Sequence, residues 1–228
     1  MKFSLRSKTF VEREFLDFIL DKIEKPEIIL DLGSATAFQS IEFSIVFPDA
    51  KIYAFECNPL SIKKCHENII NLENIEVVDK AVYNKDGFIK FYPILNYNDA
   101  SSLYKFSKDY LNTIEKFEQK MINLKATRID TWAKEKEIRK IDLCWLDLQG
   151  AEYEAIEGIG DLIYNIQALY IEVAEKAIYN GQKLIYDIKD LLENKGFSML
   201  KYFSTIPGWY GNAIFLNNKL LAQKKSKF

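Results

Sequence analysis

Residues 28–37 read IILDLGSATA, an apolar run followed by an acid, a glycine and a series of small residues. The run Ile28-Ile29-Leu30 follows Pro26 and is typical of a strand buried on both faces of a parallel sheet. Gly33 permits a tight turn and a close approach of the backbone to a ligand. A helix expected over 39–47 would bring its free N–H groups to the same place. The stretch therefore predicts a strand-turn-helix unit with a ligand site at the carboxyl end of the strand.

Segments typical of strands alternate with segments typical of helices along most of the chain. This alternation predicts an α/β fold with a mostly parallel seven-stranded sheet and helices on both faces. The last two strands are joined by too few residues for a parallel crossover, so we expect an antiparallel last strand. The expected strands are 28–30, 51–55, 75–79, 141–148, 168–173, 197–203 and 213–216, and the expected helices are 10–23, 39–47, 59–71 and 185–194, with one more after Gly150.

The length of 228 residues and a hydrophobic content of 48% are those of one globular domain. We expect a single domain that begins with a helical segment within 1–25 and ends in a basic tail at 219–228. A short edge strand is expected over 87–92. Residues 93–126 have the least regular pattern and are interpreted as an insertion, with a helix over 108–120 and a strand over 122–126.

Charge and cysteine content exclude several classes of function. A formal net charge of −2 gives no general attraction to nucleic acid or to an acidic membrane. The three cysteines lack the spacing of a zinc site or a disulfide framework, and no apolar run is long enough to span a bilayer. No signal peptide is recognisable. We therefore expect a cytoplasmic protein with neither a nucleic-acid nor a membrane partner.

An acid ends the second expected strand. Glu56 lies at the position where a carboxylate can accept hydrogen bonds from two ribose hydroxyls. Asp79 and Ala81 close the third strand, where an adenine would lie against the sheet. Together these residues indicate a nucleoside site, and they leave open whether the ligand is a nicotinamide dinucleotide or S-adenosylmethionine.

An ordered set of motifs resembles the FkbM family of S-adenosylmethionine-dependent methyltransferases over about residues 28–216. The resemblance implies a Rossmann-like class I methyltransferase fold and O-methylation, mainly of hydroxyls on sugars and on glycosylated or polyketide metabolites. The motifs are DLGSATAFQS (31–40), YAFECNP (53–59), VVDKAVYNKDGFIKFY (77–92), ASSLYKF (100–106), LKATRIDTW (124–132) and WLDLQGAEYEAIEG (145–158).

The resemblance also assigns residues to the cofactor. It implies that Asp31 and Gly33 hold the methionine end and that Glu56 binds the ribose. The chain departs from the family pattern at four positions: Ala35 replaces an Asn, Ala37 replaces a second Gly, and Trp145 and Gln149 replace the Lys and the Glu of a Lys-x-Asp-x-Glu-Gly motif, with loss of both charges. The full set of expected cofactor-binding residues is Asp31, Gly33, Ser34, Ser40, Glu56, Asn58, Asp79 and Ala81.

Methyl transfer to a hydroxyl needs a base to accept the proton. Asp147, at the end of the fourth strand, is the first candidate, and Glu172 on the fifth strand is the second. Glu152 fits a helix N-terminal acid or a residue that contacts substrate. Mg²⁺ bound by carboxylates remains an alternative, but nothing requires it and we expect no metal. The only histidine, His66, is expected on a surface helix.

The expected loop 204–212 should reach over the cofactor face. Trp209 and Tyr210 on it are candidates for stacking against a sugar, or for a hydrophobic plug. Ser102 and Tyr104 are candidates for the opposite wall. Two other functions remain open: a methyltransferase-fold binding module without turnover, and a nicotinamide-dependent oxidoreductase, which the incomplete G-x-G-x-x-G pattern disfavours.

Overall fold

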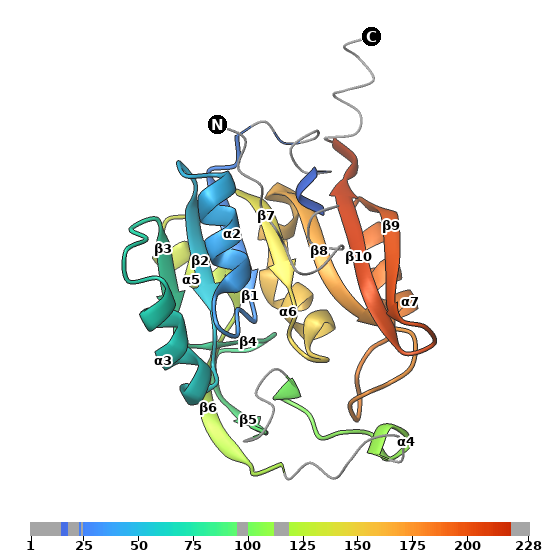
Figure 1. The fold of residues 1–228 in the computed structure, drawn as a ribbon. Helices are drawn as coiled ribbons and strands as arrows, with labels where there is room; N and C mark the ends of the chain where they lie inside the picture. Colours follow the sequence, from blue (N-terminus) through green and yellow to red (C-terminus); the bar gives the residue numbers. More distant parts are fainter. Residues whose placement is uncertain (1–14, 18–22, 24, 95–99, 112–118, 220–228) are drawn as a thin grey trace.

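The computed structural model describes residues 15–17, 23, 25–94, 100–111 and 119–219. Its centre is a seven-stranded sheet in the order β3-β2-β1-β7-β8-β10-β9 (Figure 1). Every described pair in this sheet is parallel except the two that involve β10, which confirms the mostly parallel sheet with an antiparallel last strand. The strands are β1 (Ile28–Leu32), β2 (Lys51–Phe55), β3 (Ile75–Val78), β7 (Ile141–Leu146), β8 (Ile166–Ala174), β9 (Phe197–Ile206) and β10 (Tyr210–Asn217).

Alternate side chains of the central strands enter two separate cores, as the two-residue period of a strand requires. On β1, Leu30 joins the core beneath one layer of helices, while Ile29 joins the core beneath the other. The first layer consists of α5 (Ile129–Glu135), α6 (Glu152–Ile159), the 3₁₀ helix η2 (Gly160–Asn165) and α7 (Ile185–Glu193), and the second contains α2 (Phe38–Val46). Helices thus cover both faces of the sheet, which confirms the expected fold class.

Sequence-derived element bounds need correction in several places. The helix expected over 59–71 is α3 (Pro59–Asn68), which begins where the Asn58 side chain accepts the N–H of Leu60. The expected loop 204–212 is mostly strand, because β9 and β10 are longer than predicted and a tight turn over 207–209 joins them. The sequence reading also missed α5 entirely.

A second, three-stranded sheet has the order β4-β6-β5. It contains β4 (Ala81–Val82), β5 (Gly87–Phe91) and β6 (Ile122–Thr127). The strand expected at the edge over 87–92 therefore pairs outside the main sheet. Part of the expected insertion 93–126 is tied to preceding residues, because β6 pairs with both β4 and β5.

The middle of that insertion contains a short helix, α4 (Lys108–Leu111), where a longer helix over 108–120 was expected. Residues 112–118 lie outside the described part, as do most of the expected N-terminal helix and most of the basic tail. No helix in the described ranges is long and apolar enough to cross a membrane.

Candidate active site

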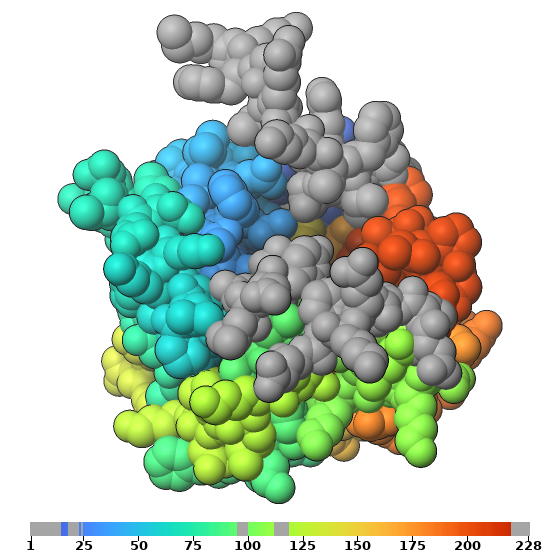
Figure 2. All heavy atoms as spheres, turned by 60° about the horizontal axis from the view of Figure 1, so that its bottom comes forward, coloured from blue at the N-terminus to red at the C-terminus, as the bar shows by residue number. Residues whose placement is uncertain are grey.

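The carboxyl ends of β1, β2, β3 and β7 surround a pocket of about 800 Å³. Figure 2 looks toward this end of the molecule, with α3 in teal and β6 in yellow-green at its border. Most expected cofactor residues lie on this pocket, as topology requires for ligands of parallel sheets. The lining residues used below are Gly33, Ser34, Phe38, Glu56, Asn58, Ala81, Ser101, Ser102, Asp147 and Gln149.

The turn after β1 is built for close approach. Gly33 has φ 90°, and a Cβ at this position would lie 1.9 Å from the backbone oxygen of Asp147. Ala35 and Ala37 also have positive φ, 49° and 64°, although both carry a Cβ. Such left-handed backbone is costly outside glycine. The turn therefore holds alanine in left-handed backbone at two positions where the family pattern has an Asn and a Gly.

Asp31 lies beneath this turn and is completely buried. Its Oδ2 accepts a hydrogen bond of 2.6 Å from the Ser40 hydroxyl on α2. Its Oδ1 has no hydrogen-bond partner in the described part of the chain. Burial, reinforced by the charge of Asp147, raises the pKa of Asp31 to about 7. A buried carboxylate oxygen without a donor is expensive, and a bound cationic group would satisfy it.

Glu56 is fixed by the start of the next helix. Its Oε1 accepts the N–H groups of Cys57 and Asn58, both at 2.7 Å. Burial raises the pKa of Glu56 to about 7 in spite of these hydrogen bonds. The carboxylate is thus held rigidly at the pocket wall.

Two other expected cofactor positions differ from each other. Ala81 lines the pocket, together with Lys80 and Val82. The Asp79 side chain is 56% exposed and lies 3.7 Å from His66, and it does not line the pocket. The pocket is therefore lined here by the residues after Asp79 and not by Asp79 itself.

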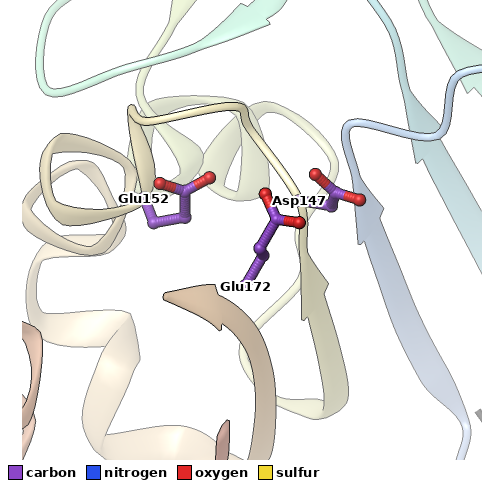
Figure 3. Close-up of side chains that lie close together, drawn as sticks. All are labelled: Asp147, Glu152 and Glu172. Atoms are coloured by element: carbon purple, nitrogen blue, oxygen red, sulfur yellow. The ribbon is translucent and has the colours of Figure 1, made fainter. Parts of the chain in front are cut away.

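Three acids gather at the carboxyl ends of β7 and β8 (Figure 3). Asp147 follows β7 and continues the alternation of Leu143 and Trp145, and Glu172 continues that of Tyr170, so both face the α2 side of the sheet. Each of Asp147, Glu152 and Glu172 has a carboxylate oxygen within 4.8 Å of the others. Figure 3 shows the Glu172 carboxylate between the other two.

Glu152 has a structural task within this cluster. Its Oε1 accepts the N–H of Leu148 at 2.8 Å, and both oxygens accept the N–H of Gly150 at 3.1 Å. It is buried at the start of α6, where the helix dipole favours an acid. Burial still raises its pKa to about 7. Glu152 therefore holds the loop 148–150 from inside.

Glu172 is crowded by the other two acids and does not itself line the pocket. Burial raises its pKa well above the usual range, and the charges of Asp147 and Glu152 add to this shift. The Gln149 amide acts in the opposite direction, since it donates to Glu172 Oε2 at 3.1 Å and to Asp147 Oδ1 at 2.6 Å. Carboxylates with shifted pKa values in a cleft are candidates for proton transfer.

The expected substrate residues divide into two groups. Ser102 is buried against the acid cluster and donates a hydrogen bond of 2.6 Å to the Gln149 carbonyl. Ser102 lines the pocket, whereas Tyr104 does not, and the Tyr104 hydroxyl lies 3.2 Å from that of Tyr83. Trp209 and Tyr210 pack against a cluster formed by Ile94, Phe106, Ile178 and Tyr179, outside the pocket lining.

Sequence reasoning missed two residues at this site. Tyr179 donates a hydrogen bond of 2.8 Å to Gln149 Oε1, so it joins the aromatic cluster to the acids. Phe38, the first residue of α2, lines the pocket and is 66% exposed. For Phe38, the available signal was a phenylalanine immediately after the small-residue turn. No motif marked Tyr179.

Comparison with known proteins identifies the family. The sequence profile described as "Methyltransferase FkbM domain" matches residues 33–199, most of the chain. The chain belongs to the FkbM methyltransferase family. This confirms the expected family, methyltransferase activity and S-adenosylmethionine as methyl donor, and it favours these over the oxidoreductase alternative.

One similar protein is "2-O-methyltransferase NoeI" of Sinorhizobium fredii, 29% identical over 210 residues that cover 89% of this chain and 84% of the relative. Among solved structures, magnesium protoporphyrin IX methyltransferase (ChlM) of Synechocystis has a TM-score of 0.54 at 14% identity, covering 91% of this chain and 78% of its own. An rRNA methylase of Streptococcus thermophilus has a TM-score of 0.52 at 11% identity, covering 92% and 98%. At such identities these structures establish the fold alone.

The residues present fit this cofactor. The orphaned Asp31 Oδ1 suits the ammonium group of the methionine part, and the backbone of the turn at Gly33 and Ser34 lines the pocket beside it. Glu56 offers a fixed carboxylate for two ribose hydroxyls. Asp147 adjoins Gly33 on the other side of the turn, and Glu172 lies beside Asp147.

Proposed function

We propose that this FkbM-family enzyme methylates a hydroxyl oxygen of a sugar or glycan. The position of Asp147 carries the proposal. It lines the cofactor pocket and adjoins Gly33, and one of its carboxylate oxygens lies within 4.8 Å of a carboxylate oxygen of Glu172. A base at this position can accept the proton of a hydroxyl that is directed toward the cofactor turn. When bound, S-adenosylmethionine supplies an activated methyl carbon.

The chain's own residues would accept the proton and position the loop that carries the base. Asp147 would accept the hydroxyl proton, a contribution of about 10²- to 10⁴-fold to the rate. Glu172, one strand away, would assist it. Glu152 positions the loop through backbone N–H groups, so we assign it no contact with substrate. Ser102 supports the same loop from its other side.

The acceptor class is supported by two features. Phe38 gives an exposed ring at the pocket, and aromatic rings suit the C–H faces of sugars. The relative NoeI is named a 2-O-methyltransferase, which agrees with oxygen as the acceptor atom. The formal charge of −2 argues against nucleic acid as the acceptor.

The compartment is the cytoplasm in this proposal. Three free cysteines, Cys57, Cys65 and Cys144, fit a reducing compartment of this kind.

Calorimetric titration with S-adenosylhomocysteine, with NADH as a second ligand, tests the cofactor site. We expect micromolar binding of the homocysteine compound, none of NADH, and loss of binding in Glu56→Ala. Glu73→Ala, an exposed acid outside the pocket, is the matched control and should bind normally. A screen of sugar acceptors with labelled methyl donor follows. Binding without transfer to any hydroxyl would overturn the enzyme assignment in favour of a binding module.

A further inference from the structure

The side chain of Gln149 lies at the centre of the acid cluster. Its Nε2 is 2.6 Å from Asp147 Oδ1 and 3.1 Å from Glu172 Oε2. A primary amide has two N–H groups, so one nitrogen can donate to both carboxylates at once. Two facing carboxylates are commonly held together by a cation or by a shared proton. Here an uncharged donor contacts both carboxylates, which also lie within hydrogen-bonding reach of each other.

The orientation of this amide is fixed by its other end. Gln149 Oε1 accepts the hydrogen bond of the Tyr179 hydroxyl at 2.8 Å. Since a hydroxyl can donate to an amide oxygen, this contact directs the oxygen away from the acids and the nitrogen toward them. Tyr179 itself is buried in the aromatic cluster with Phe106, against which its ring stacks.

The backbone of Gln149 is held as firmly as its side chain. Its φ of 51° is left-handed, a conformation that a non-glycine residue keeps only when its surroundings impose it. Ser102 Oγ donates to its carbonyl, and Glu152 accepts the N–H groups of Leu148 and Gly150 on either side. A strained residue fixed on all sides is typical of a preorganised site.

We propose that Gln149 is a positioning residue that stabilises Asp147 and Glu172 as a pair of carboxylates by donating one hydrogen bond to each, in place of a cation. This inference rests on the proposed function, in which Asp147 is the base. The other charged or titratable groups that face the pair are Asp31 from β1, Glu56 after β2, Glu152 from α6 and Tyr179. All of the acids among them oppose ionisation of the pair, and the amide acts in the opposite direction on Glu172.

The test compares Gln149→Met, which removes both N–H groups at similar volume, with the wild type. We expect the acid limb of the pH profile of kcat/KM to move to higher pH by about one to two units. The affinity for S-adenosylhomocysteine should stay within about threefold. Tyr179→Phe should shift the profile in the same direction by a smaller amount, because the amide loses the partner that orients it.

The chain supplies a matched control at the opposite end of the same strands. Gln167 donates in the same manner to the buried Asp142, far from the pocket. Gln167→Met should therefore leave the pH profile unchanged. A shift of equal size in this variant would show that the effect is a general loss of stability, and it would overturn the inference.

A second measurement does not depend on turnover. Carboxyl-carbon NMR of labelled glutamate should show Glu172 titrating at higher pH in Gln149→Met than in the wild type. An unmoved Glu172 titration overturns the role of Gln149, even if the enzyme methylates sugars. Failure of the wild type to bind S-adenosylhomocysteine would overturn the proposed function instead, so the two failures are distinguishable.

Discussion

Strand β7 has a buried or half-buried aspartate at each end, and the two have opposite surroundings. Asp142, at the amino end, accepts the backbone N–H groups of Glu27 at 2.8 Å and Ile28 at 3.1 Å. Lys140 Nζ is 2.6 Å from its Oδ1, and Gln167 donates to the same oxygen. Asp147, at the carboxyl end, faces other carboxylates.

We interpret this difference as that between a structural acid and the proposed base. Donors from the backbone and a cation offset the cost of burying Asp142. At the other end, burial and mutual repulsion raise the pKa values of Asp31, Glu56 and Glu152 to about 7. Such an arrangement costs stability and is retained where a ligand or a proton is to be bound. Removal of Asp147 should therefore lower turnover but not stability, and removal of Asp142 should lower stability but not turnover.

The largest effect is expected for Asp147→Asn. Loss of the base should lower kcat by about 10²- to 10⁴-fold with little change in S-adenosylhomocysteine affinity. The melting temperature should rise, because Asp147 repels Asp31, Glu56 and Glu172 and an amide does not. Initial rates and thermal unfolding measure the two quantities. A variant with normal turnover would remove Asp147 from the reaction.

The reverse pattern is expected for Asp142→Ala. It leaves the N–H groups of Glu27 and Ile28 and the Gln167 amide without their acceptor, at a cost of roughly 3 kcal/mol of unfolding free energy. The half-exposed Lys140 adds little to this cost. Denaturant unfolding measures the loss. Turnover below the melting transition should remain normal, and a loss of turnover at full folding would contradict the separation of the two ends.

Features of the two ends that depend on local sequence patterns could be predicted, and those that depend on contacts between distant residues could not. Period-two alternation and the glycine turn are local, so the positions of the strands along the chain and the pocket positions of Gly33 and Glu56 could be predicted. The place of Tyr179 depends on how the segment around Phe106 packs against it, a contact between distant residues. For the same reason Trp209 was expected over the cofactor but packs beside Tyr110.

The backbone conformation of the loop after β7 could not be predicted from the sequence either. Gln149 has positive φ, which its residue type does not indicate, so the sequence showed only a departure from the family motif at this position. The structure shows that the substituted amide makes two hydrogen bonds to acids. A substitution in a strained loop is thus interpretable only once its partners are known.

A smaller effect concerns pH. Because the folded pKa of Asp31 is about 7 and its ordinary value is 3.8, the folded protein holds an extra proton between these values. Stability of the ligand-free protein should therefore fall as pH rises from about 4 to 7 and then level off. Binding of S-adenosylhomocysteine, whose ammonium group favours ionised Asp31, should tighten by up to about tenfold from pH 6 to pH 8. Calorimetry in buffers of different ionisation enthalpy would detect the released proton.

Asp31→Asn is the control for this pH dependence. The amide can still accept the Ser40 hydrogen bond but does not titrate, so the dependence of affinity on pH should flatten. Affinity at pH 8 should be weaker than that of the wild type. An unchanged slope would assign the proton to Glu56, whose pKa is raised to a similar value.

The smallest effect is expected where the carboxyl end stores backbone strain instead of charge. Ala37 is buried with φ 64° immediately before α2, so Ala37→Gly removes a Cβ from left-handed backbone. Relief of that strain, partly offset by the greater freedom of glycine in the unfolded chain, should raise the unfolding free energy by about 1 kcal/mol or less. Ala50→Gly, at a buried alanine outside the left-handed region, should instead destabilise. If both variants lose stability equally, the turn is unstrained. The destabilisation at the carboxyl ends of the strands would then come from the buried carboxylates alone.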